Sequence, residues 1–192
     1  MRGDWPERKH PRLKGYDYGQ NGCYFATICV KNRVPLLGEV RGGNALLPPK
    51  VELSEMGNIA DQYMQSIKAA YENVTVENYV IMPNHIHLLI SIHEPEEPGG
   101  RVRASRPTLH TVIRSFKTMV TRQIGFSIWQ DSYYDRIIRS ERGRAEAWRY
   151  IDENPAKWKE DELFIHPQGR SPCDRKSASR RAGSPCDRKR MP

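Results

Sequence analysis

Three absences narrow the class of protein that this sequence encodes. No apolar run reaches the 18 residues that a membrane-spanning helix requires, and no secretory signal pattern is present. The four cysteines include no Cys-x-x-Cys pair, which excludes a zinc ribbon and a disulfide scaffold. We therefore expect a cytoplasmic protein without a membrane partner, in which Cys23 and Cys29 are buried thiols on one strand.

Positive charge exceeds negative charge, but unevenly along the chain. The formal net charge is +8 over 192 residues, and the segment from Arg170 to the last residue carries eight Lys/Arg against two Asp. An excess of this sign favours a polyanionic partner, most simply nucleic acid. Because the body of the chain is only mildly basic, net charge alone is weak evidence about the body.

The length accommodates one domain, which we place at residues 21–166. Residues 1–20 and 94–106 are rich in Pro, Gly and charge, and predict a flexible arm and a flexible linker. Residues 167–192 are nearly devoid of apolar side chains and contain Ser-Pro-Cys-Asp-Arg-Lys twice, starting at Ser171 and Ser184. That composition predicts a disordered basic tail.

Hydrophobic periodicity predicts four strands and three helices. Period-2 patterns and β-branched residues predict strands at 23–30, 75–82, 85–92 and 129–139. Spacings of three and four predict helices at 54–71, 109–124 and 140–153, capped by Ser54, Thr108 and Ser140. The order of these elements fits an α+β domain, an antiparallel sheet with helices on one face.

Two histidines, His85 and His87, occupy the start of the strand at 85–92. Alternate strand residues point to the same face, so the two imidazoles lie about 7 Å apart along the strand and can share one divalent metal. The alternative is that His85 is a turn residue and His87 is a hydrogen-bonded sheet histidine. A histidine-triad hydrolase would need a third histidine at position 89, which is Leu89.

Cleavage with two metal ions would need several Asp or Glu side chains around the histidine pair, but the acidic residues close to it in the sequence lie in the linker. We therefore expect the nucleophile to be a side chain. Tyr150 and Asn154 lie four residues apart on the third predicted helix and therefore on one face of it. Tyr150 could attack a phosphodiester, and the amide oxygen of Asn154 could be the third metal ligand. Alternatively, Tyr150 is a core aromatic and Asn154 a helix cap. The competing tyrosines are Tyr79, Tyr133 and Tyr134.

Several motifs occur in the order found in one known family. The segment 80–89 (VIMPNHIHLL) resembles the His-hydrophobe-His (HUH) motif of single-tyrosine transposases, and segments 129–139 and 149–158 resemble the REP-associated tyrosine transposases. The resemblance extends from about residue 15 to residue 158 and includes Gly38-Glu39 and segment 53–57. It does not cover the repeated tail, and Gly143 departs from the usual third helix.

This resemblance implies a ferredoxin-like fold of the HUH endonuclease kind and cleavage of single-stranded, hairpin-forming DNA with Mg²⁺ or Mn²⁺. The metal ligands would be His85, His87 and Asn154, and the nucleophile Tyr150. Tyrosine attack would leave a 5′-phosphotyrosine link and a free 3′-OH that allows rejoining. The resemblance favours a monomer. The rival function is a non-catalytic, sequence-specific nucleic-acid-binding protein derived from a transposase.

Five basic side chains are candidates for DNA contact. Arg114, Lys117 and Arg122 lie largely off the apolar face of the second predicted helix, where a solvated surface is the alternative explanation. Arg136 and Arg139 lie within the segment that resembles the transposases.

Overall fold

The structure, a computed structural model, describes residues 21–43, 48–93 and 107–165. The predicted arm, linker and tail lie outside the described residues. The chain divides into two units, residues 1–156 and 157–192. In the second unit, the short helix η2 (Trp158–Glu160) is followed by an edge-on contact between the rings of Trp158 and Phe164.

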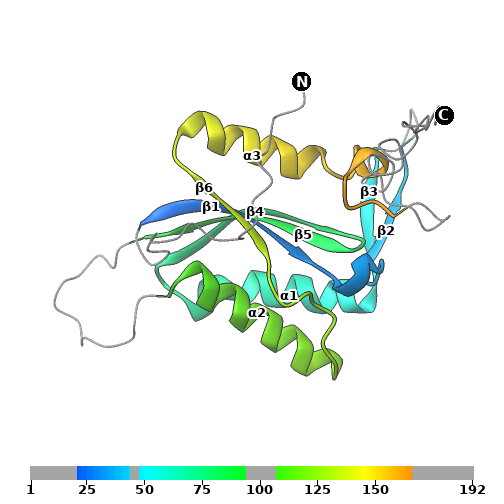
Figure 1. The fold of residues 1–192 in the computed structure, drawn as a ribbon, viewed down its shortest axis with the longest axis horizontal. Coiled ribbons are helices and arrows are strands. Elements are labelled where there is room, and N and C mark those ends of the chain that lie inside the picture. Colours follow the sequence, from blue (N-terminus) through cyan, green and yellow to red (C-terminus); the bar gives the residue numbers. More distant parts are fainter. Residues whose placement is uncertain (1–20, 44–47, 94–106, 166–192) are drawn as a thin grey trace, which may run out of the picture. The chain divides into compact units, whose positions relative to one another are not determined.

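The first unit is built on a four-stranded sheet with the order β4-β5-β1-β6, in which every pair is antiparallel. Two crossover helices complete a β-α-β-β-α-β arrangement, so the predicted ferredoxin-like α+β fold is confirmed (Figure 1). These elements are β1 (Gly22–Cys29), α1 (Glu55–Ala70), β4 (Val74–Met82), β5 (His85–Ile92), α2 (Leu109–Ile124) and β6 (Tyr134–Ile138).

A small hairpin, β2 (Gly38–Arg41) with β3 (Lys50–Leu53), was not predicted from the sequence. The final strand is shorter than predicted, because Trp129 makes only an isolated bridge with Val30 and residues 130–133 lie outside the sheet. Within the part of the chain that the structure describes, no helix has the length and hydropathy needed to cross a bilayer.

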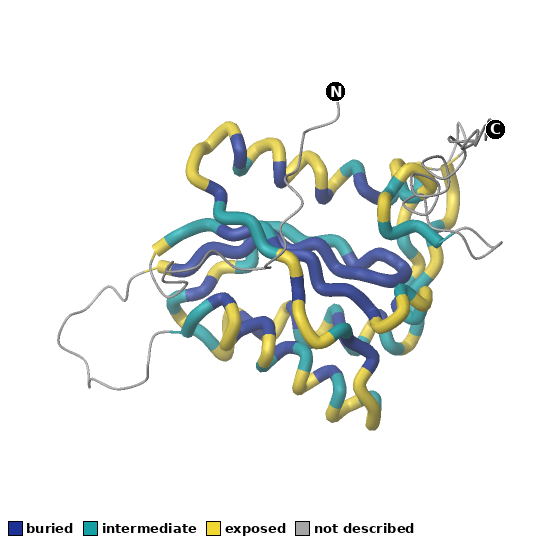
Figure 2. The backbone as a smooth tube through the Cα atoms, in the orientation of Figure 1, coloured by how far each residue is buried: buried dark blue, intermediate teal, exposed yellow. Residues whose placement is uncertain are grey.

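The two faces of the sheet are covered by different helices. α1 and α2 cover the face that carries Ile86, Leu88 and Ile90, and together they form the main core. α3 (Glu141–Glu153) lies on the opposite face (Figures 1 and 2). On that face Leu89 packs against Ala147 and Ile151. The prediction that the helices share one face therefore holds for α1 and α2 but is wrong for α3. The face with the histidines is covered, not open.

The predicted helix starts are confirmed by their caps. The side-chain oxygens of Ser54, Thr108 and Ser140 each accept a backbone N–H three residues on. Gly143 does not disturb the start of α3, since its N–H bonds to Ser140. At position 57 of α1 the close packing requires glycine, because a Cβ there would lie 1.9 Å from the carbonyl oxygen of Leu37.

Candidate active site

The imidazoles of His85 and His87 face each other on the α3 side of β5. Their Nε2 atoms are 3.0 Å apart, and the side chains are 0% and 3% exposed. Two nitrogen ligands at 2.1 Å from one ion and 90° to each other lie about 3.0 Å apart, so this spacing suits a shared metal ion. The structure brings the predicted metal-binding pair together.

The other ring nitrogens are held by neighbours that the sequence did not single out. His85 Nδ1 lies 2.8 Å from Asn84 Oδ1, and Asn84 Nδ2 donates to the carbonyl of Arg33 at 3.0 Å. The amide oxygen can only accept, so His85 carries its proton on Nδ1 and directs a lone pair from Nε2. His87 Nδ1 lies 2.9 Å from Thr27 Oγ1, which can accept the Nδ1 proton when Nε2 binds an ion.

Burial of the imidazole, with a smaller contribution from the positive charge of Arg33, lowers the pKa of His85 from 6.5 to about 3. The side chain is therefore neutral at physiological pH. A neutral imidazole is the form that binds a divalent ion, and its nitrogen is a ligand for first-row transition metals. The donor set thus fits a metal centre.

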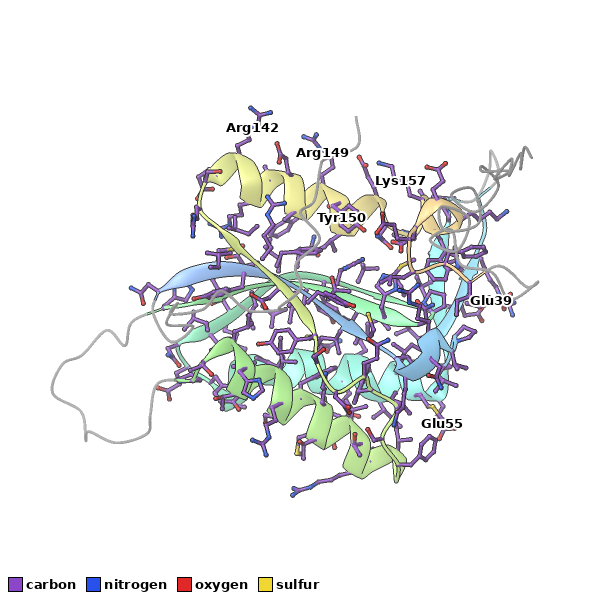
Figure 3. The ribbon with its side chains drawn as sticks, viewed as in Figure 1. Glu39, Glu55, Arg142, Arg149, Tyr150 and Lys157 are labelled. Atoms are coloured by element: carbon purple, nitrogen blue, oxygen red, sulfur yellow. The ribbon has the colours of Figure 1, made fainter. Side chains whose placement is uncertain are left out.

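Tyr150 lies on the side of α3 that faces the sheet, while Arg142 and Arg149 point away (Figure 3). Its ring centroid is 5.1 Å from that of His87 and 5.8 Å from that of Phe25, edge-on in both cases. The side chain is still 43% exposed, so Tyr150 is not a core aromatic. It combines contact with His87 and access from solvent, which is what a nucleophile requires.

A β-bulge in β4 supplies one of the contacts that hold α3 on the sheet. The register of β4 against β5 shifts between Val76 and Asn78, and the extra residue is Glu77. A bulge changes which face the extra side chain meets. Here the Glu77 carboxylate, 5% exposed, accepts hydrogen bonds from Ser91 and, at 2.7 Å, from Arg144 of α3.

The competing tyrosines lie elsewhere. Tyr79 donates to Asp61 of α1 at 2.7 Å, and burial together with this carboxylate raises the pKa of Tyr79 to about 12. Tyr133 is buried and stacks on His110 of α2. Tyr134 is 59% exposed and is on the histidine face, but it lies on β6 with β1 between it and His87.

Asn154 forms the C-cap of α3, one turn beyond Tyr150, and is 3% exposed. α3 ends there because Pro155 lacks the N–H that the next turn would need. The role of Asn154 as a metal ligand stays a prediction.

The five predicted DNA-binding residues fall into two groups. Arg114, Lys117 and Arg122 line one groove along α2, on the side of the sheet away from the histidines. Lys117 is half-buried, its pKa is lowered by burial, and its ammonium donates to two backbone carbonyls at 2.9 Å, so it stabilises the loop before β6. Arg136 lies on the histidine face of β6, and Arg139 is exposed just beyond that strand.

The fold and this geometry define a class, the single-tyrosine HUH transposases: a ferredoxin-like sheet with a paired-histidine strand beneath a helix that carries a tyrosine. The family model for IS200-like transposases matches residues 50–154, and the chain belongs to that family.

Three known proteins are similar to this chain over most of its length. An uncharacterised protein of Haemophilus influenzae is 31% identical in an alignment of 174 positions that covers 82% of this chain and 93% of that protein. A second protein of that organism, described as a "putative REP-associated tyrosine transposase", is 26% identical over 73% of this chain and 74% of its own length. A REP-associated tyrosine transposase solved bound to a REP hairpin is 19% identical, with a TM-score of 0.52 over 97% of this chain and 93% of that chain.

Proposed function

We propose that this protein is a metal-dependent tyrosine transposase that cleaves and rejoins single-stranded DNA through a 5′-phosphotyrosine intermediate. One observation carries the proposal: the ring of Tyr150 contacts His87, whose Nε2 is 3.0 Å from that of His85. A metal-binding pair and a solvent-accessible nucleophile thus meet within one site. Membership of the IS200-like family supports the same reaction class.

His85 and His87 would hold Mg²⁺ or Mn²⁺, with Asn154 as third ligand. When bound, such an ion withdraws charge from the scissile phosphate and makes the phosphorus more electrophilic. Asn84 and Thr27 hold the two rings in one orientation through their hydrogen bonds to the Nδ1 atoms, so both Nε2 lone pairs converge on one point.

Tyr150 supplies the attacking oxygen. A bond forms between its phenolic oxygen and phosphorus, the bond from phosphorus to the 3′ oxygen breaks, and the phenolic proton is released. The departing 3′ oxygen takes up a proton and becomes a free 3′-OH. Attack of another 3′-OH on the phosphotyrosine reverses these bond changes, so strands are rejoined without ATP.

The substrate is single-stranded DNA that forms a hairpin. The printed description of the structural relative, a transposase bound to a REP hairpin, supports this choice. We place the activity in the cytoplasm and in a monomer, with residues 21–166 carrying the reaction. Arg136, on the histidine face of β6, and Arg139, just beyond that strand, would contact the DNA, and the basic residues of the tail would add contacts to phosphates.

The test is covalent capture. The full chain is incubated with labelled hairpin DNA from the region flanking its gene, with Mg²⁺, Mn²⁺ or EDTA, and resolved on a denaturing gel. We expect a protein–DNA adduct with either ion and none with EDTA or with His85→Ala/His87→Ala. If the protein binds the hairpin but forms no adduct under any condition, the proposed enzyme activity is wrong and the alternative function, a non-catalytic nucleic-acid-binding protein, is supported.

A further inference from the structure

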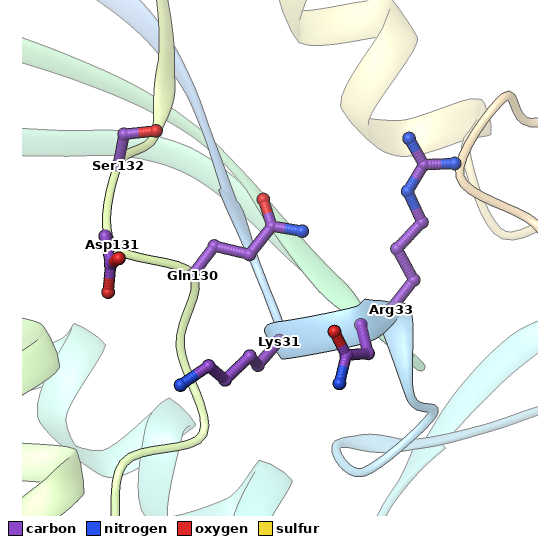
Figure 4. A pocket seen from close by; sticks show the side chains of 6 residues that line it. Lys31, Arg33, Gln130, Asp131 and Ser132 are labelled. Atoms are coloured by element: carbon purple, nitrogen blue, oxygen red, sulfur yellow. The ribbon is translucent and has the colours of Figure 1, made fainter.

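A polar pocket lies where β1 ends, beside the site described above. It has a volume of about 480 Å³, within the range of roughly 300–1,000 Å³ that small-molecule sites occupy. The short helix η1 (Lys31–Arg33) forms one side, and the segment before β6 forms the other (Figure 4). The side chains that line it are those of Lys31, Asn32, Arg33, Gln130, Asp131 and Ser132.

Both sides of this pocket are fixed to the sheet or to α2. The N–H of Gln130 donates to the carbonyl of Cys29 at 2.9 Å. The Lys117 ammonium donates to the carbonyls of Gln130 and Ser132. A ligand would therefore enter a preformed site, which reduces the ordering entropy that binding costs.

The pocket is joined to the metal-binding pair by two hydrogen bonds. The carbonyl of Arg33 accepts from Asn84 Nδ2, and Asn84 Oδ1 accepts from His85 Nδ1. Asn32 and Arg33 both adopt left-handed backbone conformations, with φ of 57° and 55°. Consecutive non-glycine residues in this conformation are strained, and strain of this kind concentrates at functional sites.

The lining groups match the parts of one nucleotide. Lys31 and Arg33 extend to different sides of the pocket and can each meet a backbone phosphate (Figure 4). Gln130 and Asp131 line the other side with an amide and a carboxylate, the groups that recognise base edges. We propose that this pocket binds the base and phosphate of one single-stranded nucleotide next to the cleaved phosphate, and so sets sequence preference. This rests on the proposed function.

Asp131 determines which bases fit. An ionised carboxylate only accepts hydrogen bonds, so it pairs with the exocyclic amino group of cytosine, adenine or guanine. Thymine has no amino group, and its single ring donor, the N3–H, lies between two carbonyl oxygens that repel the carboxylate. The pocket therefore selects against thymine at one position of the strand.

The experiment is a binding selection with the full chain carrying Tyr150→Phe, in EDTA, so that no cleavage contributes. The probe is a hairpin from DNA flanking the gene with six randomised single-stranded nucleotides on each side. We expect thymine to be depleted about tenfold or more at one position, and Asp131→Asn to remove that depletion there alone. Gln130→Ala should weaken the preference at the same position.

Lys31→Ala should weaken binding to all sequences equally and flatten the slope of log K against log salt by about 0.7. The matched control is Lys68→Ala, an exposed lysine at the end of α1, which should change neither property. An unchanged sequence profile in Asp131→Asn, or equal salt slopes for the two lysine variants, overturns the pocket. Absence of all hairpin binding overturns the proposed function as well.

Discussion

Replacing Thr27 by valine tests how the site orients its imidazoles. The hydroxyl is 2.9 Å from His87 Nδ1, and the side chain is 8% exposed. When both Nε2 atoms bind an ion, the Nδ1 proton of His87 must be donated to this hydroxyl, which valine cannot replace. Loss of such a partner weakens metal binding about 10–100-fold, or roughly 1.4–2.8 kcal/mol.

The assay is a calorimetric titration of the full chain with Mn²⁺. Thr27→Val should also lower the free energy of unfolding by about 1 kcal/mol in EDTA, because one buried hydrogen bond is lost. Thr75→Val is the matched control: Thr75 is an exposed residue of β4, paired with Ser91, away from the histidines. Equal Mn²⁺ affinities of Thr27→Val and the unaltered protein would refute the proposed orientation of His87.

Three further substitutions test other parts of the account. Gly57→Ala should destabilise the fold by about 1–3 kcal/mol in urea denaturation, since the added Cβ meets the Leu37 carbonyl. The raised pKa of Tyr79 stabilises the fold fully below pH 10 and less as pH rises to about 12, so Tyr79→Phe should remove that fall in stability while keeping adduct formation. Glu77→Gln should slow adduct formation about tenfold or more with unchanged DNA affinity, because the salt bridge to Arg144 that positions α3 is lost.

Each of these three predictions can be contradicted by a specific result, and two of them have a matched control variant. Gly143→Ala, where an added Cβ has 3.3 Å to its nearest neighbour, should cost less than Gly57→Ala, and the reverse order would contradict the packing argument. If the free energy of unfolding of Tyr79→Phe falls between pH 10 and 12 as in the unaltered protein, the raised pKa of Tyr79 is not the cause of that fall. Glu39→Gln, at an exposed residue of β2, controls for loss of charge; equal rates for the two glutamine variants would exclude positioning by Glu77.

Local patterns in the sequence were enough to predict most elements of the fold. The alternation in β5 placed both histidines on one face, and the capping serines and threonine set the helix starts. The face that α3 covers was not predictable in this way, because an amphipathic pattern shows that one side of a helix is buried and not which face of the sheet buries it.

Contacts between distant segments account for the rest of the site. Thr27 reaches His87 only through the register of β1 against β5, and Glu77 reaches Arg144 only because β4 contains a bulge. The hairpin of β2 and β3 alternates charged and apolar residues over only four residues in each strand, too short a run to predict strands from the sequence. Four tyrosines were candidates for the proposed nucleophile in the sequence, and the contact with His87 favours Tyr150 among them.

The central claim is tested most directly by locating the DNA on the chain. The covalent adduct is digested with nuclease and trypsin, and the peptide that carries the residual nucleotide is identified by mass spectrometry. Trypsin releases Tyr150 in the peptide 150–157, which contains no other tyrosine, and releases Tyr133 and Tyr134 in the peptide 123–136. The account predicts the nucleotide on peptide 150–157 and no adduct with Tyr150→Phe. A nucleotide on peptide 123–136, or an adduct that persists in Tyr150→Phe, would contradict it.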